Sequence, residues 1–237
     1  MAEWIVHFGA REARIRRKEG PFRRRILEHG SVPRSGLASR LAEGSRAGEP
    51  VRFLLSACLC HHEILESVGR IWRRDDLDAL ARARFAERLG VPASDLAVGL
   101  PVSWGDAAAV CALPGALFLE LVEAARTANL RLASVRPWIS ELIGDGSLGL
   151  RRKESIAVRE PDGVSIARAR LGCTDVASMP ATADGEARSA LAMLESGAGL
   201  PAARDWLRFA SDSPSPEDTG RAPDALFTDL ARFEAIS

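Results

Sequence analysis

The sequence has no tyrosine, and lysine occurs only at Lys18 and Lys153, so arginine supplies nearly all of its positive charge. It also has no charge imbalance, because 32 basic residues are matched by 32 acidic ones. A neutral protein has no global field that draws it to nucleic acid or to anionic lipid. The short basic clusters at 14–18, 23–25 and 151–153 contain no aromatic residues for base stacking, so we expect no nucleic-acid partner.

Long apolar runs are absent as well. The run at 51–65 is too short to cross a bilayer, and Glu3 lies where a signal peptide would carry basic and then apolar residues. We therefore expect a cytoplasmic protein with no direct membrane insertion, recruited to a membrane only through a partner. The four cysteines are scattered through apolar segments, which predicts reduced thiols in the core and not a disulfide framework.

Motifs for several kinds of catalysis are missing. The chain contains no G-x-S-x-G nucleophile elbow and no P-loop. Cys58, Cys60 and His62 would lie on one face of a strand, and this makes them weak candidates for a metal site. Side chains on one strand face point in parallel, whereas zinc ligands converge tetrahedrally. We interpret them as buried thiols beside a strand-end histidine, and we assign no metal or cofactor.

What is present is a regular order of strands and helices. Apolar periodicity, glycines and prolines define most of the boundaries. In chain order the patterns predict a strand, turn and strand over 4–15, a third strand at 22–28, a helix at 35–43, a central buried strand at 51–65, a helix from 75 to Gly90, a strand at 96–104, a buried helix after Pro114 and a strand at 130–135.

The second half repeats this pattern in a reduced form. The hairpin signal Pro161-Asp162-Gly163 joins short strands at 155–159 and 164–170. A helix at 184–196 and a strand at 203–209 follow. We predict four parts: a first subdomain at 1–143, a reduced second subdomain at 144–210, a linker at 211–223, and an amphipathic C-terminal helix at 224–237 that docks either on the body or on a partner.

The chain resembles a known superfamily in the segments Phe53–Leu65, Leu77–Gly90, Ala112–Leu117 and Leu130–Pro137. Their order and spacing are similar to the ribonuclease H-like fold that is duplicated in actin-like proteins. This implies an α/β fold with mixed sheets and a reduced second half. More specifically, the segments resemble the degenerate actin-like proteins of bacterial type IV pilus and type II secretion assembly platforms, namely PilM-like proteins and the cytoplasmic domain of the secretion L protein.

The resemblance implies where a nucleotide site would lie. Active members begin it with an apolar strand that ends in Asp-x-Gly, and here the corresponding residues are His7, Phe8 and Gly9. An imidazole does not replace the hard oxygen ligand that magnesium requires. The second-half echo, expected around Leu148–Glu154, also has no Asp-x-Gly. We therefore predict a degenerate nucleotide loop, no catalytic residues and loss of ATP hydrolysis.

The resemblance further implies a non-catalytic scaffold. Its partner would be the short cytoplasmic segment of an inner-membrane assembly protein, bound in a groove as an extended peptide. The sequence does not assign the groove residues, and it leaves a homodimer open. The alternative function is an actin-like ATPase or sugar-kinase-like nucleotide-binding protein with an atypical first phosphate loop. A small enzyme with a different site is a third candidate.

Overall fold

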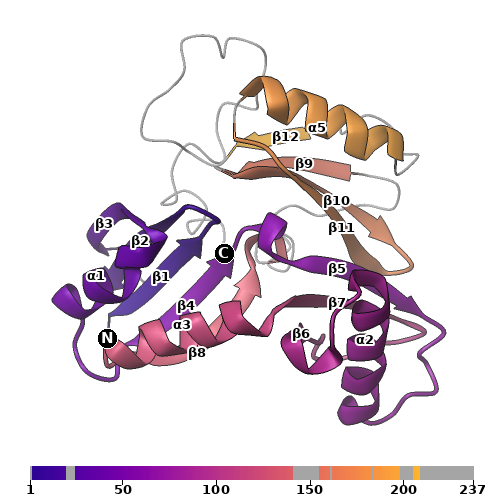
Figure 1. Cartoon of the computed structure of the whole chain (residues 1–237), viewed down its shortest axis with the longest axis horizontal. Helices are drawn as coiled ribbons and strands as arrows, with labels where there is room; N and C mark the ends of the chain where they lie inside the picture. Colours follow the sequence, from indigo (N-terminus) through magenta and orange to yellow (C-terminus); the bar gives the residue numbers. More distant parts are fainter. Residues whose placement is uncertain are drawn as a thin grey trace. The chain divides into compact units, whose positions relative to one another are not determined.

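The computed structural model describes residues 2–19, 25–140, 155–160, 162–182, 184–197 and 205–208. The elements labelled in Figure 1 are, in chain order, β1 (Glu3–Phe8), β2 (Glu12–Glu19), β3 (Arg25–Pro33), α1 (Leu37–Gly44), β4 (Pro50–Leu55), β5 (His61–Glu66), α2 (Arg74–Leu89), β6 (Leu96–Gly99), β7 (Ala107–Pro114), α3 (Gly115–Thr127), β8 (Arg131–Pro137), β9 (Ser155–Glu160), β10 (Gly163–Arg170), β11 (Cys173–Pro180), α5 (Asp184–Gly197) and β12 (Asp205–Arg208).

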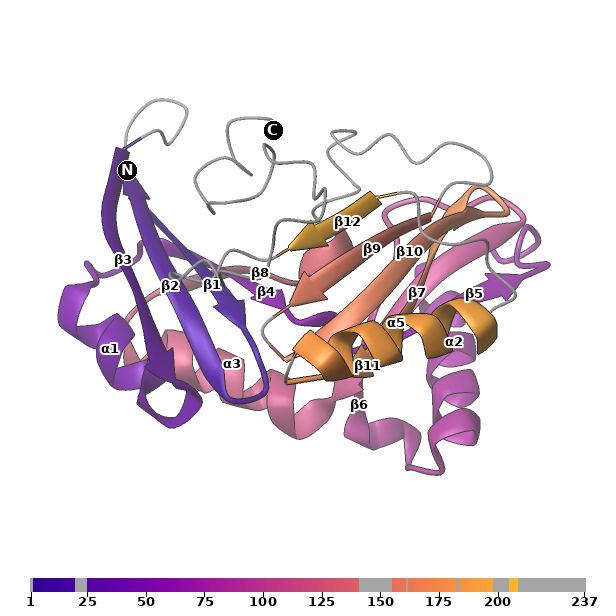
Figure 2. The same ribbon diagram turned by 90° about the horizontal axis from the view of Figure 1, so that it is seen from above.

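A five-stranded sheet in the order β3-β2-β1-β4-β8 forms the first half. The strands β1, β2 and β3 make an antiparallel meander, and β4 and β8 run parallel to β1. The parallel strands are joined by crossover segments that contain α1, between β3 and β4, and α3, between β7 and β8 (Figure 2). The meander and the mixed sheet that the sequence predicts are therefore confirmed.

Alternation along the strands determines which face of this sheet forms the core. Trp4, Val6 and Phe8 of β1 point to one face, because successive side chains of a strand alternate. They pack with the buried apolar residues of α1 and α3, including Leu41 and Leu121. The helix predicted after Pro114 is confirmed as α3, but it is buried on one face only, because Leu119, Glu120 and Glu123 are exposed.

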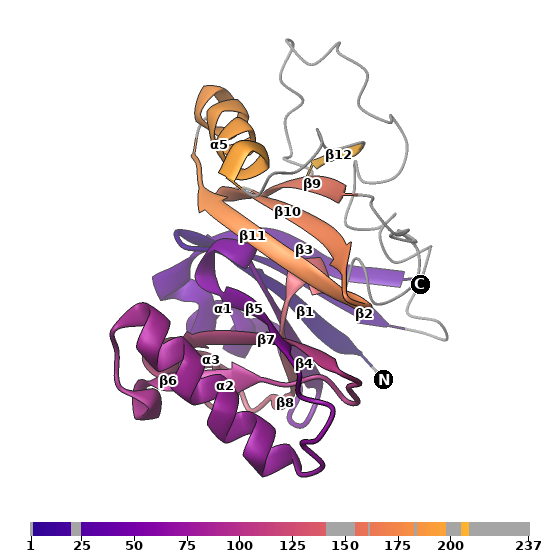
Figure 3. The same ribbon diagram turned by 90° about the vertical axis from the view of Figure 1, so that its right-hand side faces the viewer.

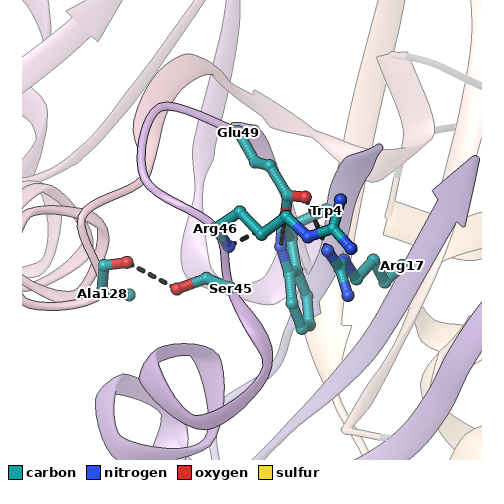
Figure 4. Close-up of polar contacts among 6 residues, drawn as sticks. All are labelled: Trp4, Arg17, Ser45, Arg46, Glu49 and Ala128. Carbon is teal, nitrogen blue, oxygen red and sulfur yellow. Dashed lines mark hydrogen bonds and ion pairs between the residues drawn. The ribbon is translucent and has the colours of Figure 1, made fainter. Parts of the chain in front are cut away.

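A buried carboxylate ties the amino-terminal ends of β1 and β4 to the carboxyl-terminal end of β2 (Figure 4). Glu49, which is 6% exposed, accepts hydrogen bonds from Trp4 Nε1 at 2.8 Å, from the Arg17 guanidinium at 2.6 Å and from the Arg46 N–H at 3.3 Å. Ser45 Oγ donates to the Ala128 carbonyl at 2.7 Å. These contacts fix the loop between α1 and β4 against the sheet.

A four-stranded sheet in the order β11-β10-β9-β12 forms the second half. The strands β9, β10 and β11 are antiparallel neighbours, and β12 runs parallel to β9. The helix α5 packs against β10 and β11 (Figure 3). This order, three meander strands, a helix and a strand parallel to the first, repeats the order of β1 to β4. The predicted duplication is confirmed, and β11 is a strand that sequence patterns did not predict.

The strands of a third sheet, in the order β5-β7-β6, and the helix α2 are inserted in the chain between β4 and α3. The existence of this sheet corrects two predictions. The central strand expected at 51–65 ends at Leu55, and a short 3-10 helix at Ala57–Leu59 separates it from β5. The strand expected at 96–104 ends at Gly99, while β7 begins only at Ala107. Backbone pairing with distant partners decides such boundaries, and apolar content alone does not.

The chain forms two compact units. The first contains Met1–His61, Ile71–Leu100 and Val110–Trp138, and the second contains His62–Arg70, Pro101–Ala109 and Ile139–Ser237. The predicted division at residue 143 stays a prediction, and the predicted linker and C-terminal helix lie outside the described residues. No helix among the described residues is long and apolar enough to span a membrane.

Candidate functional site

The carboxyl end of β1 is the position at which the resemblance places a nucleotide loop. His7 and Phe8 are the last residues of β1, and Gly9 opens the turn to β2. The Gly9 N–H donates to the Glu12 carbonyl at 2.9 Å, and the Ser56 N–H donates to the Phe8 carbonyl at 3.0 Å. These bonds close the turn and hold it against the end of β4.

His7 and Phe8 point to opposite faces of the sheet. Phe8 lies in the hydrophobic core, and the Arg34 guanidinium carbon lies 4.9 Å from the centre of its ring. His7 is 2% exposed, and its ring meets the buried ring of Trp138 edge to face, with the ring centroids 5.5 Å apart. A buried imidazole that packs on an indole therefore occupies the place where an active loop needs a carboxylate.

This environment does not fit magnesium-bound nucleotide. An imidazole provides neither negative charge nor a hard oxygen ligand. Within the ranges that the structure describes, no three His, Cys, Asp or Glu side chains are grouped so that they could hold a metal ion. At the carboxyl end of β1, the side chains of His7 and Phe8 are both taken up by buried packing contacts.

The second half has its counterpart of this turn between β9 and β10. The sequence placed the echo at Leu148–Glu154, which lies outside the described residues, whereas topology makes β9 the equivalent of β1. Here the Arg159 guanidinium donates to the carbonyls of Gly163 and Ala181, each at 3.0 Å. The Ala181 N–H also donates to the Asp162 carbonyl at 3.1 Å. An arginine side chain thus ties this turn to the end of β11.

The structure separates the three weak metal candidates. Cys58 lies in the 3-10 helix, Cys60 is buried in the core after that helix, and His62 belongs to β5. They do not share the face of one strand, so that expectation is wrong. The 3-10 helix at Ala57–Leu59 turns the chain between β4 and β5, and this turn is the reason for the difference.

A groove within the first unit is the second candidate site. It encloses about 220 Å³, which is below the range of roughly 300–1,000 Å³ typical of small-molecule pockets. Its size suits apolar side chains of a peptide better than a nucleotide. The residues that line it come from the ends of β4 and β8, from β6 and β7, and from α2 and α3: Leu55, Cys60, Arg82, Ala97, Val98, Gly99, Cys111, Leu113, Phe118, Val135, Arg136 and Pro137.

The lining of the groove is mostly apolar and includes two arginines. Burial raises the pKa of the Cys111 thiol to about 11, although the Gly99 backbone N–H opposes this shift, so Cys111 is a neutral thiol at pH 7. A Cβ atom at Gly99 would lie 2.7 Å from the Cys111 sulfur, so a larger residue there would force the thiol to move. Arg82 and Arg136 are the two arginines of the lining, and the Arg82 guanidinium is paired with the Asp78 carboxylate at 2.5 Å.

Two arginines of α2 also occupy the edge of β6. The Arg82 guanidinium donates to the Leu96 carbonyl, and the Arg74 guanidinium donates to the Leu100 carbonyl at 3.4 Å. Both carbonyls are therefore engaged in hydrogen bonds within the unit. The strand β8, which also lines the groove, is one of the two outer strands of the five-stranded sheet. The sequence analysis places no strand at 107–114 and therefore missed this groove, whereas the structure shows the alternating burial of a strand in β7.

Comparisons with known proteins bear on the fold. No protein-family model matches the sequence, and a search of curated proteins finds no match. Among solved structures, the cytoplasmic domain of EpsL, an inner-membrane component of the type II secretion system of Vibrio cholerae, is 11% identical with a TM-score of 0.64, and the match covers 99% of this chain and 93% of that one.

Two further solved structures are similar in fold. A chain of the PilM–PilN type IV pilus biogenesis complex is 14% identical with a TM-score of 0.56, over 83% of this chain and 65% of that chain. A Bacteroides thetaiotaomicron protein with an actin-like ATPase fold is 10% identical with a TM-score of 0.58, over 90% of this chain and 83% of that chain. At these identities the likeness shows the fold, so the chain has the actin-like fold that the sequence indicated, in a form similar to the EpsL cytoplasmic domain and the PilM–PilN protein.

Proposed function

We propose that this chain is a non-catalytic, actin-like scaffold protein of a type II secretion or type IV pilus assembly platform. It acts in the cytoplasm and is recruited to the inner membrane by a partner, whose short cytoplasmic segment it binds in an extended conformation. The observation that carries the non-catalytic part is the buried contact between His7 and Trp138. A carboxylate that could position a metal ion is missing where the fold would need it.

The groove supports the binding part of the proposal. An extended peptide points alternate side chains to the same side, so an apolar floor accepts every second residue. Leu113, Phe118 and Val135 provide apolar lining, and Arg136 adds a positive charge toward a carboxylate of the peptide, whereas Arg82 is already paired with Asp78. The expected ligand is therefore a short segment with alternating apolar residues and at least one acidic residue.

Calorimetric titration with magnesium and ATP tests the non-catalytic part. We expect neither binding nor hydrolysis in the parent protein or in the His7→Asp variant, because the His7 position is enclosed against Trp138. Magnesium-dependent ATP hydrolysis that falls when His7 is changed would refute this part. It would favour the alternative, an actin-like ATPase or sugar-kinase-like protein with an atypical first phosphate loop.

A matched pair of variants tests the groove. Val98 lines the groove, whereas Val91 is exposed in the connection before β6 and is not part of the lining. Immobilised protein should retain single-span inner-membrane proteins from a detergent extract, and synthetic peptides of their cytoplasmic segments should bind. Val98→Arg should weaken peptide binding at least tenfold, and Val91→Arg should leave it unchanged. Equal binding by both folded variants would reject the groove, and retention of soluble metabolic proteins alone would reject the scaffold.

A further inference from the structure

A recess in the second unit shares no residue with the His7 turn or with the groove. It encloses about 1,120 Å³, which is slightly above the range of roughly 300–1,000 Å³ typical of small-molecule pockets. Three loops form it: the segment after β5, the segment between β6 and β7, and the tip of the β10–β11 hairpin. The residues that line it are Glu66, Ser67, Gly69, Arg70, Ser103, Trp104, Gly105, Asp106, Ala107, Leu171, Gly172 and Cys173.

Unfavourable backbone conformations gather at this recess. Among the described residues, three residues other than glycine have positive φ, namely Ser67, Asn129 and Leu171. Asparagine tolerates the left-handed region, whereas serine and leucine are strained in it. Ser67, with φ of 58°, and Leu171, with φ of 52°, both line the recess. Strained residues of this kind cluster where proteins clamp ligands, so their position points to a binding site.

Contacts between the three loops hold the recess open in one shape. The Arg170 guanidinium binds the Glu66 carboxylate at 2.6 Å, and this ion pair joins the hairpin tip to the end of β5. The Val68 N–H donates to the Asp106 carbonyl at 3.0 Å, which joins the segment after β5 to the β6–β7 segment. Gly69 permits this approach, since a Cβ atom there would lie 2.2 Å from an Asp106 carboxylate oxygen. A ligand therefore meets a preformed site.

Two side chains of opposite charge in the lining do not neutralise each other. Arg70 and Asp106 are both exposed, and neither side chain forms an ion pair or a hydrogen bond within the described part of the chain. An arginine binds a carboxylate through two parallel N–H donors, and an aspartate accepts hydrogen bonds from an ammonium group. A ligand that carries both charges can pair with both residues, whereas a ligand with a single charge would meet one residue of its own sign.

We propose that this recess binds a small zwitterionic ligand, namely a short peptide with free termini. The ammonium group of the peptide pairs with Asp106, and its carboxylate pairs with Arg70. The apolar part between the two charges packs against Trp104 and Leu171, which also line the recess. Leu171 is 57% exposed, and covering its apolar surface is favourable. This contact gives a reason for a leucine in a strained turn position.

Titration of the isotopically labelled full chain with tripeptides, followed by nuclear magnetic resonance, tests the ligand. The probes are tripeptides with alanine at both ends and an apolar residue at the centre. We expect the indole N–H signal of Trp104, identified by its loss in Trp104→Phe, to shift on binding. N-terminal acetylation or C-terminal amidation of the peptide should each weaken binding about tenfold, because each removes a hydrogen bond between charged groups.

Two variants show which residue recognises which terminus. Asp106→Asn should weaken binding of the free tripeptide about tenfold and abolish the effect of acetylation, while amidation still weakens binding. Arg70→Gln should show the converse, with loss of the effect of amidation alone. Arg188→Gln is the matched control, because Arg188 is exposed on α5 and lies outside the lining, so this variant should bind as the parent does.

Three results would overturn the proposal. The first is the absence of any shift with the tripeptides up to about 10 mM, a concentration at which even weak ligands bind. The second is equal binding of free and capped tripeptides, or capping effects that persist unchanged in both variants. The third is binding of glycerophosphoethanolamine, a lipid headgroup with the same two signs of charge, in place of every tripeptide. None of these results depends on the proposed groove in the first unit.

Discussion

Replacement of Glu49 by glutamine should destabilise the first unit far more than the loss of an exposed carboxylate. The Glu49 side chain is buried, and its carboxylate joins Trp4, Arg17 and the Arg46 N–H. Glutamine keeps the shape but carries one acceptor oxygen and one donor NH₂ group. If the oxygen faces Trp4, the NH₂ group faces the Arg17 guanidinium, and a donor then opposes a donor.

The expected loss of unfolding free energy follows from the hydrogen bond and ion pair that Arg17 loses. A hydrogen bond to a charged group contributes about 1.5–3 kcal/mol, and breaking a buried ion pair costs about 3–5 kcal/mol. The Arg17 side chain keeps 14% of its exposure, so water partly compensates the loss. We expect Glu49→Gln to lower the free energy of unfolding by about 2–4 kcal/mol. For a protein of this size, that corresponds to roughly 5–15 °C in Tm.

Urea unfolding followed by circular dichroism measures this change, and hydrogen exchange of the β1 and β4 amides shows that it arises in the first unit. Glu43→Gln is the matched control, because Glu43 is 68% exposed and lies 3.4 Å from Arg40 within α1. An exposed pair of this type contributes less than about 0.5 kcal/mol. Equal unfolding midpoints for Glu49→Gln and Glu43→Gln would refute the reasoning.

The difference should also depend on pH. Burial acts to raise the pKa of Glu49, but hydrogen bonds from Arg17, Trp4 and the Arg46 backbone outweigh it and lower the pKa below its usual 4.5. A lowered pKa in the folded state means that the ionised carboxylate stabilises the protein at neutral pH and loses this effect as pH falls. Because glutamine does not titrate, the stability gap between parent and Glu49→Gln should be full near pH 7 and shrink progressively below pH 4.5.

Two further predictions concern single residues. Gly90→Ala should cost about 1 kcal/mol in urea unfolding, because Gly90 ends α2 with φ of 66°, and an unchanged midpoint would contradict this. In a variant that keeps only Cys111, iodoacetamide should react roughly 100-fold more slowly at pH 8 than in urea, since burial raises the thiol pKa to about 11 from 9.0. Similar rates in buffer and urea would show that this thiol is not buried.

Helices and turns that depend on neighbouring residues could be predicted from the sequence alone. The helix expected from 75 to Gly90 is α2, and the hairpin expected around Pro161-Asp162-Gly163 is β9 and β10. These elements form where helical periodicity, a left-handed glycine or a turn signal acts within a few residues. The order of these elements then made the actin-like fold recognisable.

The sequence by itself determined the repeated order of strands and helices and the missing carboxylate at His7. Only the tertiary structure decided that Trp138 packs on His7, that Glu49 joins Trp4 and Arg17, and that β6 and β7 form a groove with β8. Each of these contacts joins residues far apart in the chain. Their partners are selected by packing and backbone pairing of the whole unit, and a local pattern carries no signal for that selection.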